Sequence, residues 1–340
     1  NNNVAIGRDC LDANTTGTGN VALGVAALGA NTTSNYNTAI GLDVLQNNTA
    51  ADNTGVGRNV LNANTTGTKN TAAGALALDA NTTADRNTAI GYQSLSANTT
   101  GERNTAVGTY SLISNTTGGD NAAFGDAALY NNSASYNTAV GRSAMSQNTT
   151  GASNVAVGYG ALNDNTTASN NTAVGRDALE NNTTGTQNVA IGRDALYTAN
   201  TDNNTAIGYE AMKVATASEC VAVGSRALKA QTTAARCTAV GSEAATAITT
   251  ADDTTAIGRS ALAACTTGAN NTALGSKALM VATTGAMNTA VGVLSLGAIT
   301  TSLQNTAVGY HSQAYSTGSD NTSLGHEALR GAASNNVATG

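Results

Sequence analysis

A five-residue block, Asn-[Thr/Val]-Ala-[Ile/Val]-Gly, recurs along the whole chain, from residues 3–7 to residues 336–340. Successive repeat glycines lie 17 residues apart at most steps and 16 at several others. The residue three before each glycine is nearly always Thr or Val, and β-branched side chains favour a pleated backbone. The Asn-Thr-Thr-Gly stretch that follows has the composition of a turn. A repeat of this length predicts two to three short strands and turns, which is typical of one coil of a β-solenoid.

The repeat predicts an all-β fold, a parallel β-solenoid of about 21 coils of 16–17 residues that runs continuously over residues 1–340. A single coil cannot bury its apolar residues, but coils stacked in register bury them against their neighbours. With ~4.8 Å between adjacent strands, such a stack predicts a rod about 100 Å long. Every repeat position then becomes a column of equivalent side chains.

Two apolar columns are expected to form the core. They are the Ile, Val or Leu directly before the repeat glycine and the Leu or Met four residues after it, where only Ala245 and Gln313 depart. Two sizeable side chains per coil make a thin core, so backbone ladders and a further interface are expected to contribute. The column two before the glycine is Ala except at Gly55 and Ser323. It marks either a seam where a second chain approaches closely or a tight bend inside one coil.

Four residues before the glycine, an asparagine column predicts a structural ladder in which stacked amides donate to and accept from neighbouring coils. Representative members are Asn20, Asn37, Asn70, Asn87, Asn104, Asn154 and Asn188. A second asparagine column, seven after the glycine, stops near residue 199. The chain therefore divides into an Asn-ladder-rich part, 1–198, and a more apolar, Cys-containing part, 199–340. Cys220 and Cys237 share one phase in consecutive coils, either as a possible thiol pair within disulfide range or as small side chains in asparagine positions.

The composition narrows the function. Aromatic residues make up 3% and charged residues 11%, Pro and Trp are absent, and the net charge is −6. Without a Lys/Arg cluster or an apolar run of about 20 residues, we expect neither nucleic-acid binding nor membrane insertion. No column carries a carboxylate along the whole chain, and the two histidines, His311 and His326, lie at different phases. We therefore expect no enzyme activity, metal or cofactor.

Variable residues follow each repeat glycine, and many are Arg or Tyr, which recognition surfaces favour. They define a candidate contact stripe, with a solvated corner of no binding role as the alternative. The stripe comprises Arg8, Arg58, Tyr92, Arg142, Tyr159, Arg176, Arg193, Tyr209, Arg259 and Tyr310. Asn-Thr-Thr, as at Asn14 and Asn98, also matches the N-glycosylation acceptor, which would carry sugar only in a eukaryotic secreted protein.

The Val-Ala-Ile-Gly and Val-Ala-Val-Gly blocks at residues 4–7, 155–158 and 189–192 resemble the head repeats of trimeric autotransporter adhesins. They are equally similar to the Asn-Thr-Ala-Ile-Gly repeats of phage tail fibres, although the step here is longer than that of the adhesin heads. The resemblance implies a left-handed parallel β-roll, three chains side by side, and binding to a host surface. It also implies an extracellular, cell-surface or virion location.

Three functions follow as hypotheses. The first is a structural fibre or adhesin shaft, a homotrimer whose outer face binds a cell surface or polysaccharide. The second is a filament subunit that stacks end to end into a polymer, since unpaired strand edges favour association. The third is an ice-binding solenoid, because the Asn-Thr-Thr turns align polar columns.

Overall fold

The computed structural model of the chain describes residues 2–331 and 334–339, which fold as a parallel β-solenoid of about 20 turns. This part of the chain contains strands, turns and bends but no helix. The predicted all-β solenoid is therefore confirmed. Each coil contributes one strand of three residues rather than the two or three strands expected, because the remainder of the coil is built from turns.

The chain divides into two compact units, Asn1–Asn170 and Asn171–Gly340. The first unit contains β1 (Val4–Ile6), β2 (Val21–Leu23), β3 (Thr38–Ile40), β4 (Thr54–Val56), β5 (Thr71–Ala73), β6 (Thr88–Ile90), β7 (Thr105–Val107), β8 (Ala122–Phe124), β9 (Thr138–Val140) and β10 (Val155–Val157). The second contains β11 (Thr172–Val174), β12 (Val189–Ile191), β13 (Thr205–Ile207), β14 (Val221–Val223), β15 (Thr238–Val240), β16 (Thr255–Ile257), β17 (Thr272–Leu274), β18 (Thr289–Val291), β19 (Thr306–Val308), β20 (Thr322–Leu324) and β21 (Val337–Thr339).

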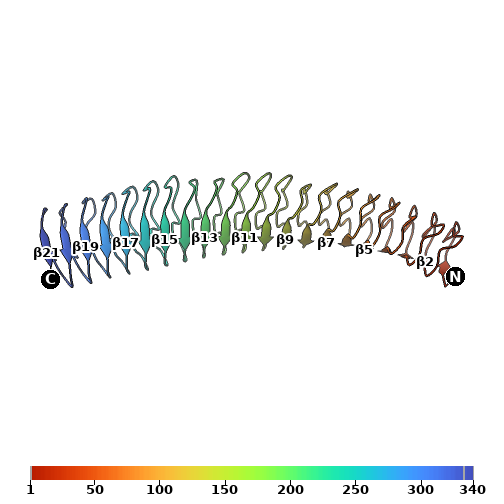
Figure 1. Ribbon diagram of the computed structural model, residues 1–340, viewed down its shortest axis with the longest axis horizontal. Coiled ribbons are helices and arrows are strands. Elements are labelled where there is room, and N and C mark those ends of the chain that lie inside the picture. Colours follow the sequence, from red (N-terminus) through yellow and green to blue (C-terminus); the bar gives the residue numbers. More distant parts are fainter. Residues whose placement is uncertain (1, 332–333, 340) are drawn as a thin grey trace. The chain divides into compact units, whose positions relative to one another are not determined.

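Within each unit, every strand pairs in parallel with the strand of the next coil, and Figure 1 shows a loop joining each strand to the next. The register aligns equivalent repeat positions, so that Ala89 lies beside Ala106 and Ile90 beside Val107. Equivalent side chains therefore do form columns, as the repeat predicts. The composition change expected at residue 199 falls inside the second unit.

The turns after each strand depend on backbone with positive φ. The repeat glycines lie near φ +135°, as in Gly125 at 141°. A Cβ on Gly125 would lie 2.6 Å from the carbonyl oxygen of Gly141 in the next coil, so only glycine permits this close approach. Three further positions in a typical coil, including Ala127 (φ 54°) and Leu129 (φ 52°), also adopt the left-handed region. Non-glycine residues reach it at an energetic cost, which the surrounding hydrogen bonds must offset.

The strands face the opposite way from the sequence-based expectation. The central alanine of each strand is buried, as for Ala139 with 0% exposure, whereas the residue before the repeat glycine points outward, as for Val140 with 38% exposure. The predicted apolar core column before the glycine is therefore wrong, because only a small side chain fits inside the coil at this strand. The first and third residues of each strand form what we call the outward strand face.

The inner alanine column answers the question that the sequence left open. Its members lie inside their own coils, so the column is a tight interior and not a seam with a second chain. Packing there is complementary. At Gly55, a Cβ would lie 2.6 Å from Cγ1 of Val44, so the glycine accommodates a larger neighbour. The sequence reading missed a further small inner column, three after the glycine, to which Val44, Ala128 and Ala144 belong.

The leucine column four after the glycine is buried, as predicted, from Leu28 onward through most of the described coils. One exception in this column, Gln313, lies near an exception in the alanine column, Ser323. The Nε2 of Gln313 donates to Ser323 Oγ at 2.9 Å, and Ser312 shares a hydrogen bond with the same hydroxyl. The buried amide nitrogen therefore has polar partners, whereas the Oε1 of Gln313 has none among the described residues.

The inverted strand predicts contrasting effects of substitution at two adjacent residues of β9. Ala139→Leu forces a large side chain into a filled interior and should lower the free energy of unfolding by about 1–3 kcal/mol. Measured on the monomeric chain, Val140→Thr changes an exposed side chain and should remain within about 0.5 kcal/mol. Urea denaturation followed by circular dichroism measures both. Equal effects, or a larger effect at Val140, would contradict this orientation.

Candidate surface-contact site

All ten residues of the candidate contact stripe are exposed, because they occupy the turn that directly follows the repeat glycine. The first unit positions Arg8, Arg58, Tyr92, Arg142 and Tyr159, and the second positions Arg176, Arg193, Tyr209, Arg259 and Tyr310. The stripe is therefore accessible in each unit. Accessibility alone does not separate a contact surface from a solvated corner, so the neighbours of these residues matter.

In the first unit, the stripe includes an aromatic ladder. The ring of Tyr92 packs edge-on against Tyr110 with centroids 5.5 Å apart, and Tyr110 packs against Tyr130 at 6.3 Å. Arg142 lies 5.9 Å from the ring centroid of Tyr159. Tyr110 and Tyr130 occupy the second and fifth positions after their glycines, so an inspection of one repeat phase alone misses them. Comparing neighbouring phases one coil apart would have found this signal.

In the second unit, the stripe carries cations above recessed carboxylates. Arg176 pairs with Asp177 at 2.9 Å, and the side chain of Asp177 is only 11% exposed against 61% for the arginine. Arg193 and Arg226 lie 5.6 and 5.7 Å from the ring of Tyr209. Such cation–π contacts hold the guanidinium groups against the protein and fix the tyrosine between them.

Glu210 is the most heavily paired carboxylate of this region. Its side chain is 9% exposed, and its oxygens lie 2.7 Å from Lys229 Nζ, 3.2 Å from Lys213 Nζ and 3.3 Å from Arg226 Nε. The hydrogen bonds from Lys229 and Lys213 lower the pKa of Glu210 to about 2. The sequence reading did not single out this group, since its three cations come from two coils and from different repeat phases.

The seven asparagines of the predicted ladder lie buried in the coil interior. Their side chains bridge coils in a fixed manner. The Oδ1 of Asn87 accepts the backbone N–H of Asn104 at 2.9 Å, and its Nδ2 donates to the carbonyl of Gly101 at 2.9 Å. The amide therefore bonds mainly to the backbone of the next coil, and at some steps also to the next amide, as where the Nδ2 of Asn121 donates to Asn104 Oδ1 at 3.1 Å.

The second asparagine column also contains amide-to-amide bonds. The Nδ2 of Asn98 donates to Asn81 Oδ1 at 3.1 Å and to the carbonyl of Gly101 at 2.9 Å. Asn98 is buried, so this glycosylation acceptor is inaccessible in the folded chain. Beyond residue 199 the same interior position holds apolar residues such as Ile248 and Ile299.

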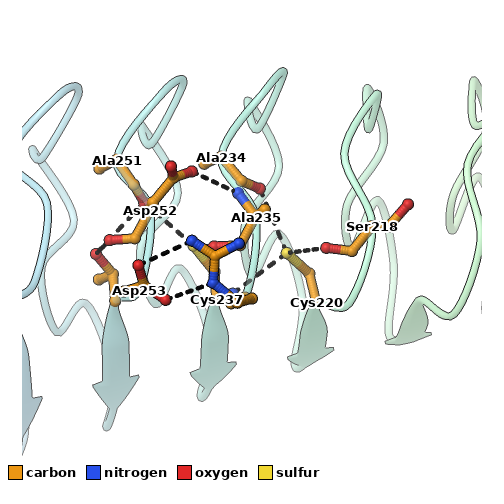
Figure 2. A network of polar contacts seen from close by, with 10 residues as sticks. Ser218, Cys220, Ala234, Ala235, Cys237, Ala251, Asp252 and Asp253 are labelled. Atoms are coloured by element: carbon orange, nitrogen blue, oxygen red, sulfur yellow. Dashed lines mark hydrogen bonds and ion pairs between the residues drawn. The ribbon is translucent and has the colours of Figure 1, made fainter.

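Cys220 and Cys237 lie in consecutive coils of the second unit as free, buried thiols (Figure 2). The Cys237 backbone N–H donates to Cys220 Sγ at 3.3 Å, and the Cys237 thiol donates to the carbonyl of Ala251 at 3.2 Å. The hydrogen bond with the Cys220 thiol, together with burial, raises the pKa of Cys237. The two thiols fill asparagine positions and take over part of the ladder bonding.

An exposed ion pair adjoins Cys237 in the sequence. Arg236 donates two hydrogen bonds to Asp253, at 2.6 and 2.9 Å, across one coil step. The described residues contain no cluster of three His, Cys, Asp or Glu side chains that could hold a metal ion. Within the same ranges, no helix has the length and hydropathy to cross a membrane.

The fold and these surfaces define the chain as a parallel β-solenoid repeat protein. A scan against protein-family models found no match, and a search of curated proteins found no significant relative either.

The Glu210 cluster predicts a pH-dependent contribution to stability. Because its folded pKa lies below the ordinary value of 4.5, this contribution is present above about pH 4.5 and is lost as the pH falls toward 2. Glu210→Gln should lower the free energy of unfolding at neutral pH by roughly 1–2 kcal/mol. The difference from the unmodified protein should shrink between pH 4.5 and pH 2.

Denaturation midpoints measured across this pH range test the prediction. Glu219→Gln is a matched control, because Glu219 is exposed and lies on a different part of the coil. A deficit of Glu210→Gln that stays constant down to pH 2 would show that the carboxylate charge is not what stabilises the cluster.

Proposed function

We propose that the chain is a structural shaft for attachment to a host or environmental surface, with no enzymatic activity. In this proposal it acts outside the cell or on a virion, and it assembles side by side as a homotrimer. One observation carries the assembly: the outward strand face is uncharged and largely aliphatic, yet it is exposed in the isolated chain. Ile90 is 45% exposed and Phe124 is 42% exposed on this face.

The interior explains why such a face needs a partner. Most described coils bury one large aliphatic side chain, usually leucine, together with alanines and asparagines. The second large aliphatic residue of the coil lies outside. Contiguous exposed apolar surface is typical of an interaction site, and burying it against other copies would add the stability that a thin interior lacks.

The contact stripe supports the attachment role. Its Arg and Tyr residues lie in the turn after the strand and not on the outward strand face. Assembly through the strand face would therefore leave the stripe available for a cell-surface or polysaccharide receptor. Aromatic and arginine side chains provide large contact areas and multiple donors at such surfaces.

Light scattering coupled to size exclusion tests the assembly. The unmodified protein should elute as a discrete particle of three times the chain mass of 33.5 kDa. Replacing Ile90, Val107 and Val140 with Lys places three charges on the outward strand face and should give monomers, because buried unpaired charges are costly. Far-ultraviolet circular dichroism checks that the variant remains folded.

A control with equal added charge uses Gln93→Lys, Asn131→Lys and Gln147→Lys, which lie off the outward strand face and should leave the trimer intact. A monomeric unmodified protein at tens of micromolar would contradict assembly through this face. Particles that grow steadily with concentration would instead favour the filament hypothesis.

Ice binding is a second candidate function. The strand threonines, and not the Asn-Thr-Thr turns, form the face that suits it. In the Asn-Thr-Thr turns, the Thr99 hydroxyl donates to the carbonyl of Thr116 in the next coil at 3.1 Å. The strand threonines, such as Thr88 and Thr105, have no hydrogen-bonded hydroxyl within the described ranges, and they stand in a regular column beside the aliphatic one. A regular, uncharged array of this kind favours ordered water.

Freezing-point measurements decide this candidate. Thermal hysteresis at micromolar protein that disappears on replacing Thr88 and Thr105 with Lys would support it. If no hysteresis is detected in a sample that light scattering shows to be monomeric, the ice-binding hypothesis is wrong.

A further inference from the structure

A small recess opens on the surface of the second unit, near its C-terminal coils. It has a volume of about 200 Å³ and is lined by Leu294, Gly297, Ala298, His311, Ala314 and Tyr315. All six residues come from turns that follow β18 and β19, and none belongs to the outward strand face. The recess would therefore remain open in a side-by-side assembly.

The recess exists because two consecutive coils lack a large side chain at one phase. Five residues after the repeat glycine, the coils on either side carry Met280 and Arg330, whereas the two between them carry Gly297 and Ala314. Stacked coils place equivalent positions side by side, so two small residues between two large ones leave a hollow. Tyr315, at the next position of the repeat, is 58% exposed and lines one side of the recess.

The lining combines apolar walls with one polar atom in need of a partner. Leu294 and the ring of Tyr315 provide apolar surface, and the Arg330 guanidinium lies 5.0 Å from the Tyr315 centroid. Nδ1 of His311 is buried and has no hydrogen-bond partner among the described residues. A buried polar atom without a partner carries a desolvation penalty, which a ligand hydroxyl would relieve.

The imidazole of His311 is held in place by its neighbours. Its ring lies 4.2 Å from the ring of Tyr310, which in turn stacks on His326 at 5.2 Å with an angle of 16° between the planes. The His311 backbone N–H donates to the carbonyl of Val293 at 3.0 Å. A preorganised polar group beside apolar walls is the usual composition of a small-molecule site.

We propose that this recess binds a single pyranose ring of a surface polysaccharide. A pyranose has an apolar C–H face, which suits Tyr315 and Leu294, and hydroxyls at its edge, one of which can bond to His311 Nδ1. The volume admits one sugar ring and not a longer stretch of chain. The inference rests on the proposed attachment function, because it names the class of receptor that the shaft would contact.

Saturation-transfer NMR on the full chain tests the recess with methyl pyranosides of glucose, galactose and N-acetylglucosamine. At least one should receive saturation from the protein, whereas cyclohexanol, which has a ring of similar size but a single hydroxyl, should bind at least tenfold more weakly. Ala314→Met fills the hollow with the side chain that Met280 already places at this phase. It should weaken the sugar at least tenfold.

Ala263→Met provides the matched control, because Ala263 has the same phase in a coil outside the recess; it should leave sugar binding unchanged. His311→Phe keeps an aromatic ring but removes the nitrogen, and should weaken binding about fivefold to tenfold. Circular dichroism establishes that each variant is folded.

Three results would overturn the site: no transfer to any pyranoside, equal binding of cyclohexanol, or equal effects of the two methionine variants. A trimer that binds no pyranoside would remove the recess as a sugar site and leave the shaft proposal standing. A monomer whose pyranoside binding is lost on Ala314→Met would support the sugar site and remove the trimeric shaft.

Discussion

The bond between an asparagine side chain and the backbone of the next coil is the interaction on which the rest of the solenoid depends. The side chain of Asn87 accepts a hydrogen bond from the backbone N–H of Asn104 and donates one to the carbonyl of Gly101. One amide therefore fixes both the spacing and the register of two coils. Both groups are buried, and an unpaired buried amide would cost about 1–3 kcal/mol. Each coil is therefore stable only with a correctly placed neighbour, which is the behaviour of a stacked repeat array.

The same constraint sets the size of the interior and hence the character of the surface. Polar ladders and repeat glycines bring the backbone close together, so the strand can direct only alanine inward. The larger aliphatic residue of the strand is left outside. An exposed, largely aliphatic outward face and a thin interior thus have one physical origin, and together they underlie the proposed assembly through that face.

Much of the fold could be predicted from the sequence, since a fixed repeat, β-branched residues and turn composition leave few alternatives. The buried leucine and asparagine columns also follow from periodicity. Which face of the strand points into the coil could not be predicted. Alternation shows that Ala139 and Val140 face opposite ways, but it does not show which one is inside. Hydrophobicity favoured Val140, but the close backbone approach of neighbouring coils, which no single repeat reveals, decides for Ala139.

The sites were less predictable than the fold. The exposed Arg and Tyr residues could be located by phase. The partners of Glu210, however, come from its own coil and the next, and the recess beside His311 arises from small residues in two consecutive coils. Such features depend on particular departures from the repeat, Gly297 and Ala314 among them. Periodicity describes what every coil shares, so it does not predict features that arise from such departures.

Hydrogen exchange of asparagine side-chain amides, followed by NMR on the full chain, tests the central interaction most directly. We expect two populations, with the amides of Asn87, Asn98 and Asn104 protected for hours and those of exposed asparagines such as Asn203 exchanging at the rate of free amides. Rapid exchange of every asparagine side chain in a sample that is folded by circular dichroism would contradict it.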